Sequence, residues 1–162
     1  MARSSSATSR PRRIVTPDQK YHSTKVTKLI NRAMIDGKKS IATAQVYLAF
    51  EVLEKQLKRP ALDVLDEVVR NITPAMEVRS RRVGGASYQV PMPVRPARQY
   101  SLATRWLVEE ARKRSNSTYH TFGEKLAAEM LDALKNEGGA ISKKITMHKS
   151  ADANKAFAHF RW

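Results

Sequence analysis

The histidines and two pairs of adjacent carboxylates are the residues in this sequence that could do acid–base or metal chemistry. Glu109-Glu110 and Asp66-Glu67 are adjacent pairs, which on a helix are expected to point apart. The histidines are scattered without metal-ligand spacing: His22, His120, His148 and His159. No local signature of a Ser/His/Asp triad is present. We therefore expect no enzyme activity, no metal site and no cofactor.

A glycine-lysine segment offers a different kind of chemistry, the binding of phosphate. Residues 37–40 read Gly-Lys-Lys-Ser, like the end of a nucleotide-binding loop. That motif needs a glycine where Arg32 stands and a hydroxyl residue where Lys39 stands. The segment is better interpreted as a tight turn between helices that directs Lys38 and Lys39 toward phosphate oxygens. An ordinary solvated turn is the alternative, because exposed lysines are common.

The charge of the whole chain supports a polyanionic partner. Its 162 residues carry 30 Lys and Arg against 15 Asp and Glu, a formal net charge of +15. Self-repulsion of this size weakens a compact fold unless a polyanion neutralises it. Nucleic acid, an anionic membrane and an acidic protein are the candidates. Cysteine is absent, which excludes disulfides, and the longest apolar run, 46–50, is too short to span a bilayer.

The basic residues are segregated into three zones that are nearly free of acids. These zones are the segment before Asp18, the segment between Glu77 and Glu109, and the segment from Gly138 onward, where Asp152 is the one acid. The intervening stretches 51–77 and 109–137 mix both signs, as solvated helix faces do. The three zones are therefore predicted to contact phosphate.

Residues 1–17 are rich in Ser, Arg and Pro and have almost no apolar content. Such a segment cannot offset its own ordering entropy, so we predict a basic tail that is disordered when free. A transit peptide of an organelle has a similar composition and stays open as an alternative. The remainder, 18–162, is predicted to be a single domain, since neither a repeat nor a domain boundary is apparent.

Apolar periodicity of the helical kind predicts a mainly α fold. Apolar faces occur at 26–34, 42–57, 62–72, 102–111 and 127–134, with a weaker one (Ile141, Ile145, His148, Ala151) near the end. The first helix should begin near Ser23 or Thr24 and end at Gly37, and Ser40 should cap the second helix. The third helix should have Pro60 in its first turn and should end at Pro74. Thr121 with Glu124 should form the capping box of the fifth helix. Trp106 is expected in the core.

Between the third and fourth helices the period changes to two, which predicts a β-hairpin over about 75–94 with its turn at Gly84-Gly85. We expect a single apolar side, formed by Met76, Val78, Tyr88, Val90 and Met92. A lone ribbon is marginal in water, so the hairpin should be mobile and add little stability to the body. Its polar residues suit either an arm that binds RNA or a sheet edge whose charges prevent aggregation. These residues are Arg79, Arg81, Arg82, Tyr88 and Gln89.

Several motifs together resemble the bacterial-type family of small-subunit ribosomal protein seven. These are Pro17-Asp18 before Tyr21, Ile30-Asn31 followed by DGKKS at 36–40, RVGGASYQVP at 82–91, LATRW at 102–106 and HKSADANKAFAHFRW at 148–162. They cover nearly the whole chain in the family's order. The resemblance implies a six-helix body with a hairpin that protrudes between helices three and four.

The resemblance also implies a structural role in the small ribosomal subunit. The chain would bind the 3′ major domain of small-subunit rRNA, organise assembly of the head and lie at the tRNA exit site, near mRNA and ribosomal protein eleven. The rRNA contacts would fall to Arg3, Arg10, Arg12, Arg13, Lys38, Lys39, Arg95, Arg98, Arg112, Lys113, Arg114, Lys143, Lys144 and Lys149. The exit-site arm would use Arg79, Arg81, Arg82, Tyr88 and Gln89.

Other functions are weaker readings of the same residues. A basic DNA-compacting protein or an RNA chaperone is the main alternative, and it would bind duplex DNA as well as folded RNA. An RNA-modifying enzyme would need a cofactor loop or an acid–base cluster, and neither is apparent. A membrane partner is not expected, because the basic residues lie on turns and an arm rather than along one amphipathic helix. The expected location is the cytoplasmic ribosome, with an organellar ribosome as the alternative.

Overall fold

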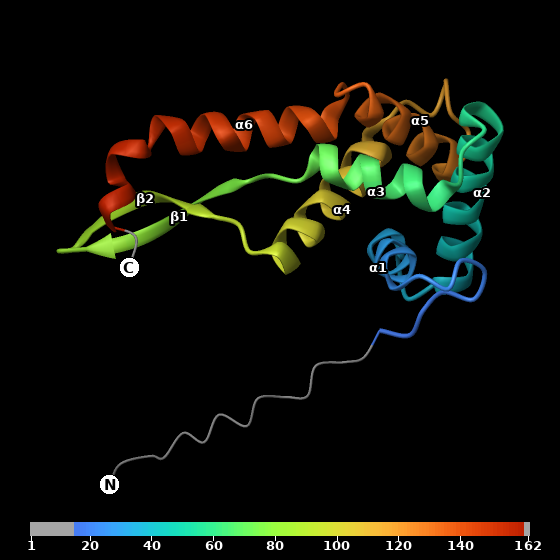
Figure 1. Cartoon of the computed structure of the whole chain (residues 1–162), viewed down its shortest axis with the longest axis horizontal. Coiled ribbons are helices and arrows are strands. Elements are labelled where there is room, and N and C mark those ends of the chain that lie inside the picture. The colour runs from blue at the N-terminus through green and yellow to red at the C-terminus, as the bar shows by residue number, and fades with distance from the viewer. Residues whose placement is uncertain (1–14, 161–162) are drawn as a thin grey trace, which may run out of the picture.

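The computed structural model describes residues 15–160 and consists mainly of helices, with one antiparallel hairpin (Figure 1). The helices are α1 (Thr24–Ala33), α2 (Lys39–Leu57), α3 (Ala61–Ile72), α4 (Pro96–Lys113), α5 (Phe122–Leu134), α6 (Gly139–Ala153) and the 3-10 helix η1 (Lys155–Phe160). Strands β1 (Met76–Val83) and β2 (Ala86–Pro93) lie between α3 and α4. The predicted fold class is confirmed. The tail arginines Arg3, Arg10, Arg12 and Arg13 lie outside the described residues.

The core forms where α1 to α5 bury one face each. From α1 it takes Leu29 and Ile30, and from α4 Trp106 and Leu107, as the periodicity predicts. Phe50 of α2 is also fully buried, although it was not part of the predicted face. Helix α5 packs against α2, α3 and α4 and so lies at the centre of the body. Burial of these side chains is the main stabilising contribution to such a helical body.

The predicted start of α1 and the predicted capping box of α5 are confirmed. Ser23 is the N-cap of α1, where its hydroxyl accepts a hydrogen bond from the backbone N–H of Lys25. At α5 the hydroxyl of Thr121 accepts from the N–H of Glu124, and the Glu124 carboxylate accepts from the N–H of Thr121. These reciprocal bonds satisfy donors that have no partner inside the helix.

The predicted boundaries between α1 and α2 and at the start of α3 are wrong by a few residues. Helix α1 ends at Ala33, and Gly37 instead serves the connecting turn, where its φ of +72° follows a φ of +53° at Asp36. Helix α2 then starts at Lys39, so Ser40 lies inside it and caps nothing. Pro60 is the N-cap residue of α3 rather than a residue of its first turn.

The buried faces of α3 and α6 also differ in part from the prediction. Helix α3 buries Val64 and Val68 fully, whereas Leu62 and Val69 are only partly buried. The apolar face of α3 is wide, and only the residues at its centre are fully buried against neighbouring helices. On α6 the side chain of Ile145 is 47% exposed although it was expected in the core.

The hairpin has the predicted two-residue turn, but the predicted single apolar side is wrong. Gly84 and Gly85 both have positive φ, and the turn pairs Val83 with Ala86. This register places Val78 opposite Pro91 and places Val90 opposite Arg79. Cross-strand partners share a face, so Met76 and Val78 lie on the opposite face from Tyr88, Val90 and Met92.

The hairpin is not a lone ribbon, which corrects a second expectation. Figure 1 shows α6 running alongside it, and η1 reaches back to β2. The ring of Tyr88 lies 5.3 Å from that of Phe157 and 5.0 Å from that of Phe160, measured between centroids. At the hairpin base the backbone N–H of Ala75 donates to Nε2 of His148 at 3.0 Å. The C-terminal segment therefore supports the hairpin along its length.

Candidate nucleic-acid interface

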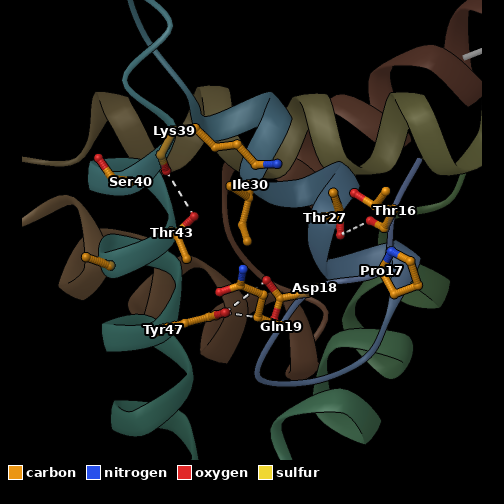
Figure 2. A pocket seen from close by; sticks show the side chains of 11 residues that line it. Thr16, Pro17, Asp18, Gln19, Thr27, Ile30, Lys39, Ser40, Thr43 and Tyr47 are labelled. Carbon is orange, nitrogen blue, oxygen red and sulfur yellow. Dashed lines mark hydrogen bonds between the residues drawn. The ribbon is translucent and has the colours of Figure 1, made fainter. Parts of the chain in front are cut away.

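The root of the N-terminal segment is fixed to the body by the carboxylate of Asp18. This carboxylate is buried and accepts hydrogen bonds from the hydroxyl of Tyr47 at 2.8 and 2.9 Å and from the backbone N–H groups of Lys20 and Tyr21 (Figure 2). Burial and the hydrogen bond with Asp18 raise the pKa of Tyr47, so its phenol keeps the proton that it donates. The hydroxyl of Thr27 adds a bond to the carbonyl of Thr16 at 2.9 Å.

These contacts form one wall of a polar cleft of about 700 Å³ between the N-terminal segment, α1 and α2. Lys39 and Ser40 lie at the opposite wall, and Ile30 is at the floor (Figure 2). The cleft places the N-terminal segment beside the turn that carries Lys38 and Lys39. Both lysines are exposed, so residues 16–19 adjoin the turn that is predicted to bind phosphate.

A second cleft lies between α1 and the start of α4, and its basic lining residues come from α1. It has a volume of about 450 Å³, and Lys28, Arg32, Tyr100 and Ser101 contribute to its lining. Arg32 donates to the hydroxyl of Ser101 at 3.3 Å, and Nζ of Lys28 lies 5.5 Å from the centroid of the Tyr100 ring. Burial raises the pKa of Tyr100, which donates its proton to a backbone carbonyl of α1. We call this the α1–α4 cleft.

The predicted residues Arg95 and Arg98 lie at the end of α4 that borders the α1–α4 cleft, and both are exposed. Lys28 and Arg32 were missed by the sequence reasoning. They lie on the polar side of an amphipathic helix, which gives the same pattern whether the side faces water or RNA. The signal that could have found them is that the polar side of α1 carries bases but no acid, Lys25, Lys28 and Arg32.

The polar residues of the hairpin do not form one surface. Arg82 lies near the turn, where its Nε donates to the carbonyl of Gly85 at 3.4 Å, and Gln89 is exposed. Arg81 pairs with Tyr88 across the strands, and Tyr88 packs on the C-terminal phenylalanines. Arg79, nearer the base, is held by the carboxylate of Glu77. The turn and the base thus have different chemistry.

The basic run 112–114 mainly joins helices to one another. Arg112 donates to the carbonyl of Ala33 at 3.0 Å, and Lys113 pairs with Glu110 at 2.7 Å. Arg114, only 19% exposed, donates to the buried carboxylate of Glu129 at 2.7 and 2.9 Å and also pairs with Asp132. Of the three, Arg114 is the least available to a partner.

The lysines of α6 also differ among themselves. Lys143 lies 2.5 Å from Glu109 and 3.0 Å from Glu110, so this adjacent pair converges on one cation, contrary to the sequence expectation. The helix geometry separates the Cβ atoms, but the long side chains bend toward a shared partner. Lys144 donates to the carbonyl of Asn71 at 2.6 Å, whereas Lys149 is exposed.

Neither a membrane-spanning helix nor a metal site was found within residues 15–160. No helix in this range is long and apolar enough to cross a bilayer. Within the same range, no three His, Asp or Glu side chains gather in a way that could hold a metal ion.

Comparison with a family model and comparison with individual known proteins identify the same family. Residues 4–155 match the family model described as ribosomal protein S7p/S5e. The sequence is 55% identical over 151 residues to the small ribosomal subunit protein uS7 of Thermoanaerobacter sp. strain X514, which covers 93% of this chain and 95% of the relative. The uS7 proteins of Carboxydothermus hydrogenoformans and Dictyoglomus thermophilum are 53% and 54% identical, over 94% and 93% of this chain and 96% and 94% of their own.

Proposed function

This chain belongs to the ribosomal protein S7p/S5e family, and from this premise we propose that it binds small-subunit rRNA directly, in the 3′ major domain, and organises assembly of the head. The family consists of structural proteins of the small ribosomal subunit rather than enzymes. The chain is of the bacterial type, and in a bacterium such a protein works in the cytoplasm as part of the ribosome.

The α1–α4 cleft is the observation that carries the proposal. Two cations line the cleft from α1, and Arg95 and Arg98 lie at the adjoining start of α4. The two helices pack against each other, so the core rather than flexible loops fixes the spacing of these cations. A rigid arrangement of Lys28, Arg32, Arg95 and Arg98 matches phosphates that a folded RNA presents at fixed positions. Selectivity by shape and backbone is the usual mode for double-helical RNA, whose deep major groove excludes side chains.

The direct test compares the double variant Arg32→Ala, Arg95→Ala with the wild-type chain in binding to a transcript of the 3′ major domain. Each lost phosphate contact should lower the slope of log affinity against log salt by about one. Lys55→Ala removes an exposed charge on α2, away from the cleft, and serves as the control. Equal loss in the control would mean that net charge, rather than the cleft, drives binding.

A competitor experiment separates rRNA recognition from DNA compaction. Unlabelled duplex DNA of equal length should compete poorly with the folded transcript at about 150 mM salt, where non-specific contacts are weakened. Equal competition would favour the DNA-compacting alternative and contradict the proposal.

We assign the far end of the molecule to the tRNA exit site, near mRNA and ribosomal protein eleven. Arg82 lies near the hairpin turn, and the rings of Phe157 and Phe160 in η1 pack on Tyr88. Both segments support this assignment, since they lie toward the opposite end of the molecule from α1 (Figure 1). Subunits assembled with Arg82→Ala should bind rRNA normally but release exit-site tRNA faster in a filter-retention assay. A loss of rRNA affinity with normal tRNA release would reverse the assignment.

A further inference from the structure

The carboxylate of Glu77 is the most enclosed charged group of the hairpin, with the residue 3% exposed. Its two oxygens bind guanidinium groups from two different elements. Oε1 accepts from Nε of Arg79 in β1 at 2.6 Å, and Oε2 accepts from Nε of Arg98 in α4 at 2.5 Å. One buried acid therefore joins the hairpin to the first turns of α4.

The two arginines that hold Glu77 are themselves half exposed, at 50% and 49% of their side chains. A guanidinium carries five N–H donors, so an edge that binds a carboxylate leaves donors for another oxygen. With one carboxylate and two guanidinium groups, the cluster has a net charge of +1. It presents two guanidinium groups of fixed orientation to solvent while its single negative charge is covered.

Burial alone would raise the pKa of Glu77, but the hydrogen bonds from Arg98 and Arg79 outweigh it and bring the pKa below its ordinary value. The group thus stays ionised at neutral pH. It can hold both arginines at once because each carboxylate oxygen accepts from one guanidinium. A glutamine at this position has a single acceptor oxygen, and its NH₂ group can only donate.

We propose that Glu77 is a positioning residue for RNA recognition. It does not touch RNA but holds the guanidinium groups of Arg79 and Arg98 in the orientation in which they bind backbone phosphates of a folded RNA. The inference rests on the proposed rRNA-binding function. Fixing both side chains before binding lowers the entropy lost when the complex forms, which raises affinity without any new contact. It also favours RNAs whose phosphates match the spacing of the two guanidinium groups.

The loss of this carboxylate has opposite expected effects on RNA affinity under simple electrostatics and under the positioning role. Removal of a negative charge beside a polyanion should strengthen RNA binding, because the net charge of the protein rises by one. Positioning predicts that the same change weakens binding, because both arginines lose their fixed orientation. The sign of the effect therefore distinguishes the two explanations.

The test measures binding of full-length Glu77→Gln to a transcript of the 3′ major domain, beside Glu67→Gln as the control. Glu67 pairs with one exposed arginine, Arg59, at 2.8 Å and lies on α3. We expect Glu77→Gln to bind between about threefold and thirtyfold more weakly, which lies within the range of coupling between contacting residues. Glu67→Gln should bind as well as the wild type or slightly better. Unchanged or tighter binding by Glu77→Gln overturns the inference.

A double-mutant cycle excludes a merely structural explanation. With Arg79→Ala and Arg98→Ala already present, Glu77→Gln should cause no further loss of affinity, because the groups it positions are gone. If Glu77→Gln does not fold by circular dichroism, Arg98→Lys decides the matter, since it keeps the charge and removes the guanidinium group. Wild-type affinity in Arg98→Lys would then overturn the inference.

The failure of the inference and of the proposed function give different results. If the wild-type chain does not select the folded transcript over a duplex, the proposed function fails. If the wild type selects it and Arg32→Ala weakens binding while Glu77→Gln does not, only the positioning role of Glu77 fails.

Discussion

Replacement of Arg114 by alanine should destabilise the fold more than it weakens RNA binding. The change leaves the carboxylate of Glu129, which is 2% exposed, with the backbone N–H of Ala140 as its remaining hydrogen bond, at 3.0 Å. Removal of one partner of a buried ion pair costs about 3–5 kcal/mol. Arg114 keeps some contact with solvent, so the lower end, about 3 kcal/mol, is expected. For a domain of this size that lowers the melting temperature by roughly 6–12 °C.

Thermal unfolding followed by circular dichroism at 222 nm measures this effect, with Arg95→Ala as a control that removes an exposed arginine. Addition of Glu129→Gln to Arg114→Ala should recover part of the loss, because the uncompensated buried charge is then gone. An Arg114→Ala variant that melts within about 1 °C of the wild type yet binds rRNA poorly would refute the reasoning. It would show that Arg114 binds RNA and contributes little to the stability of the fold.

Four further predictions follow from the same contacts. If roughly six phosphates are neutralised, rRNA affinity should fall about a thousandfold between 50 and 200 mM salt, and a flat response in filter binding would contradict this. Removal of residues 1–14 should weaken rRNA binding without lowering the melting temperature, because the segment from 15 onward keeps its anchor on Asp18; a large thermal loss would show that the removed residues pack on the body. Tyr88→Ala should cost about 1–3 kcal/mol in urea unfolding through lost contacts with two phenylalanines, whereas an unsupported hairpin would show no change. Burial raises the pKa of Glu110, but the hydrogen bonds from Lys113 and Lys143 lower it overall, so this group adds stability above about pH 4.3 that is lost as the pH falls through its folded pKa; Glu110→Gln should flatten the stability profile there, and an unaltered acid profile would contradict the assignment.

The sequence predicted the elements of the fold well, because their signals are local. The apolar face of α1 and the capping box of Thr121 and Glu124 each depend on residues within one or two turns. Boundaries were less accurate at the turn before α2, where Ser40 was predicted as the cap. The left-handed pair at Asp36 and Gly37 places the N-cap at Lys38, two residues earlier.

The candidate surface was harder to predict because its decisive contacts join distant residues. Nothing near Glu77 in sequence indicates that Arg98, 21 residues later, completes its shell. The same holds for Arg114, whose partner Glu129 lies on the next helix. Charge composition identifies a basic protein, but it does not separate cations that face a partner from cations consumed by internal ion pairs.

The support that α6 and η1 give to the hairpin has a consequence for the order of events during synthesis. Helices α1 to α5 leave a translating ribosome first, and domains form progressively from the N-terminus. The contacts of Ala75 with His148 and of Tyr88 with Phe157 and Phe160 become available only when the last segment has emerged. A nascent or prematurely terminated chain can therefore complete its body and still carry an unbraced hairpin. The hairpin therefore gains its support from α6 and η1 only after the chain has been translated through Phe160.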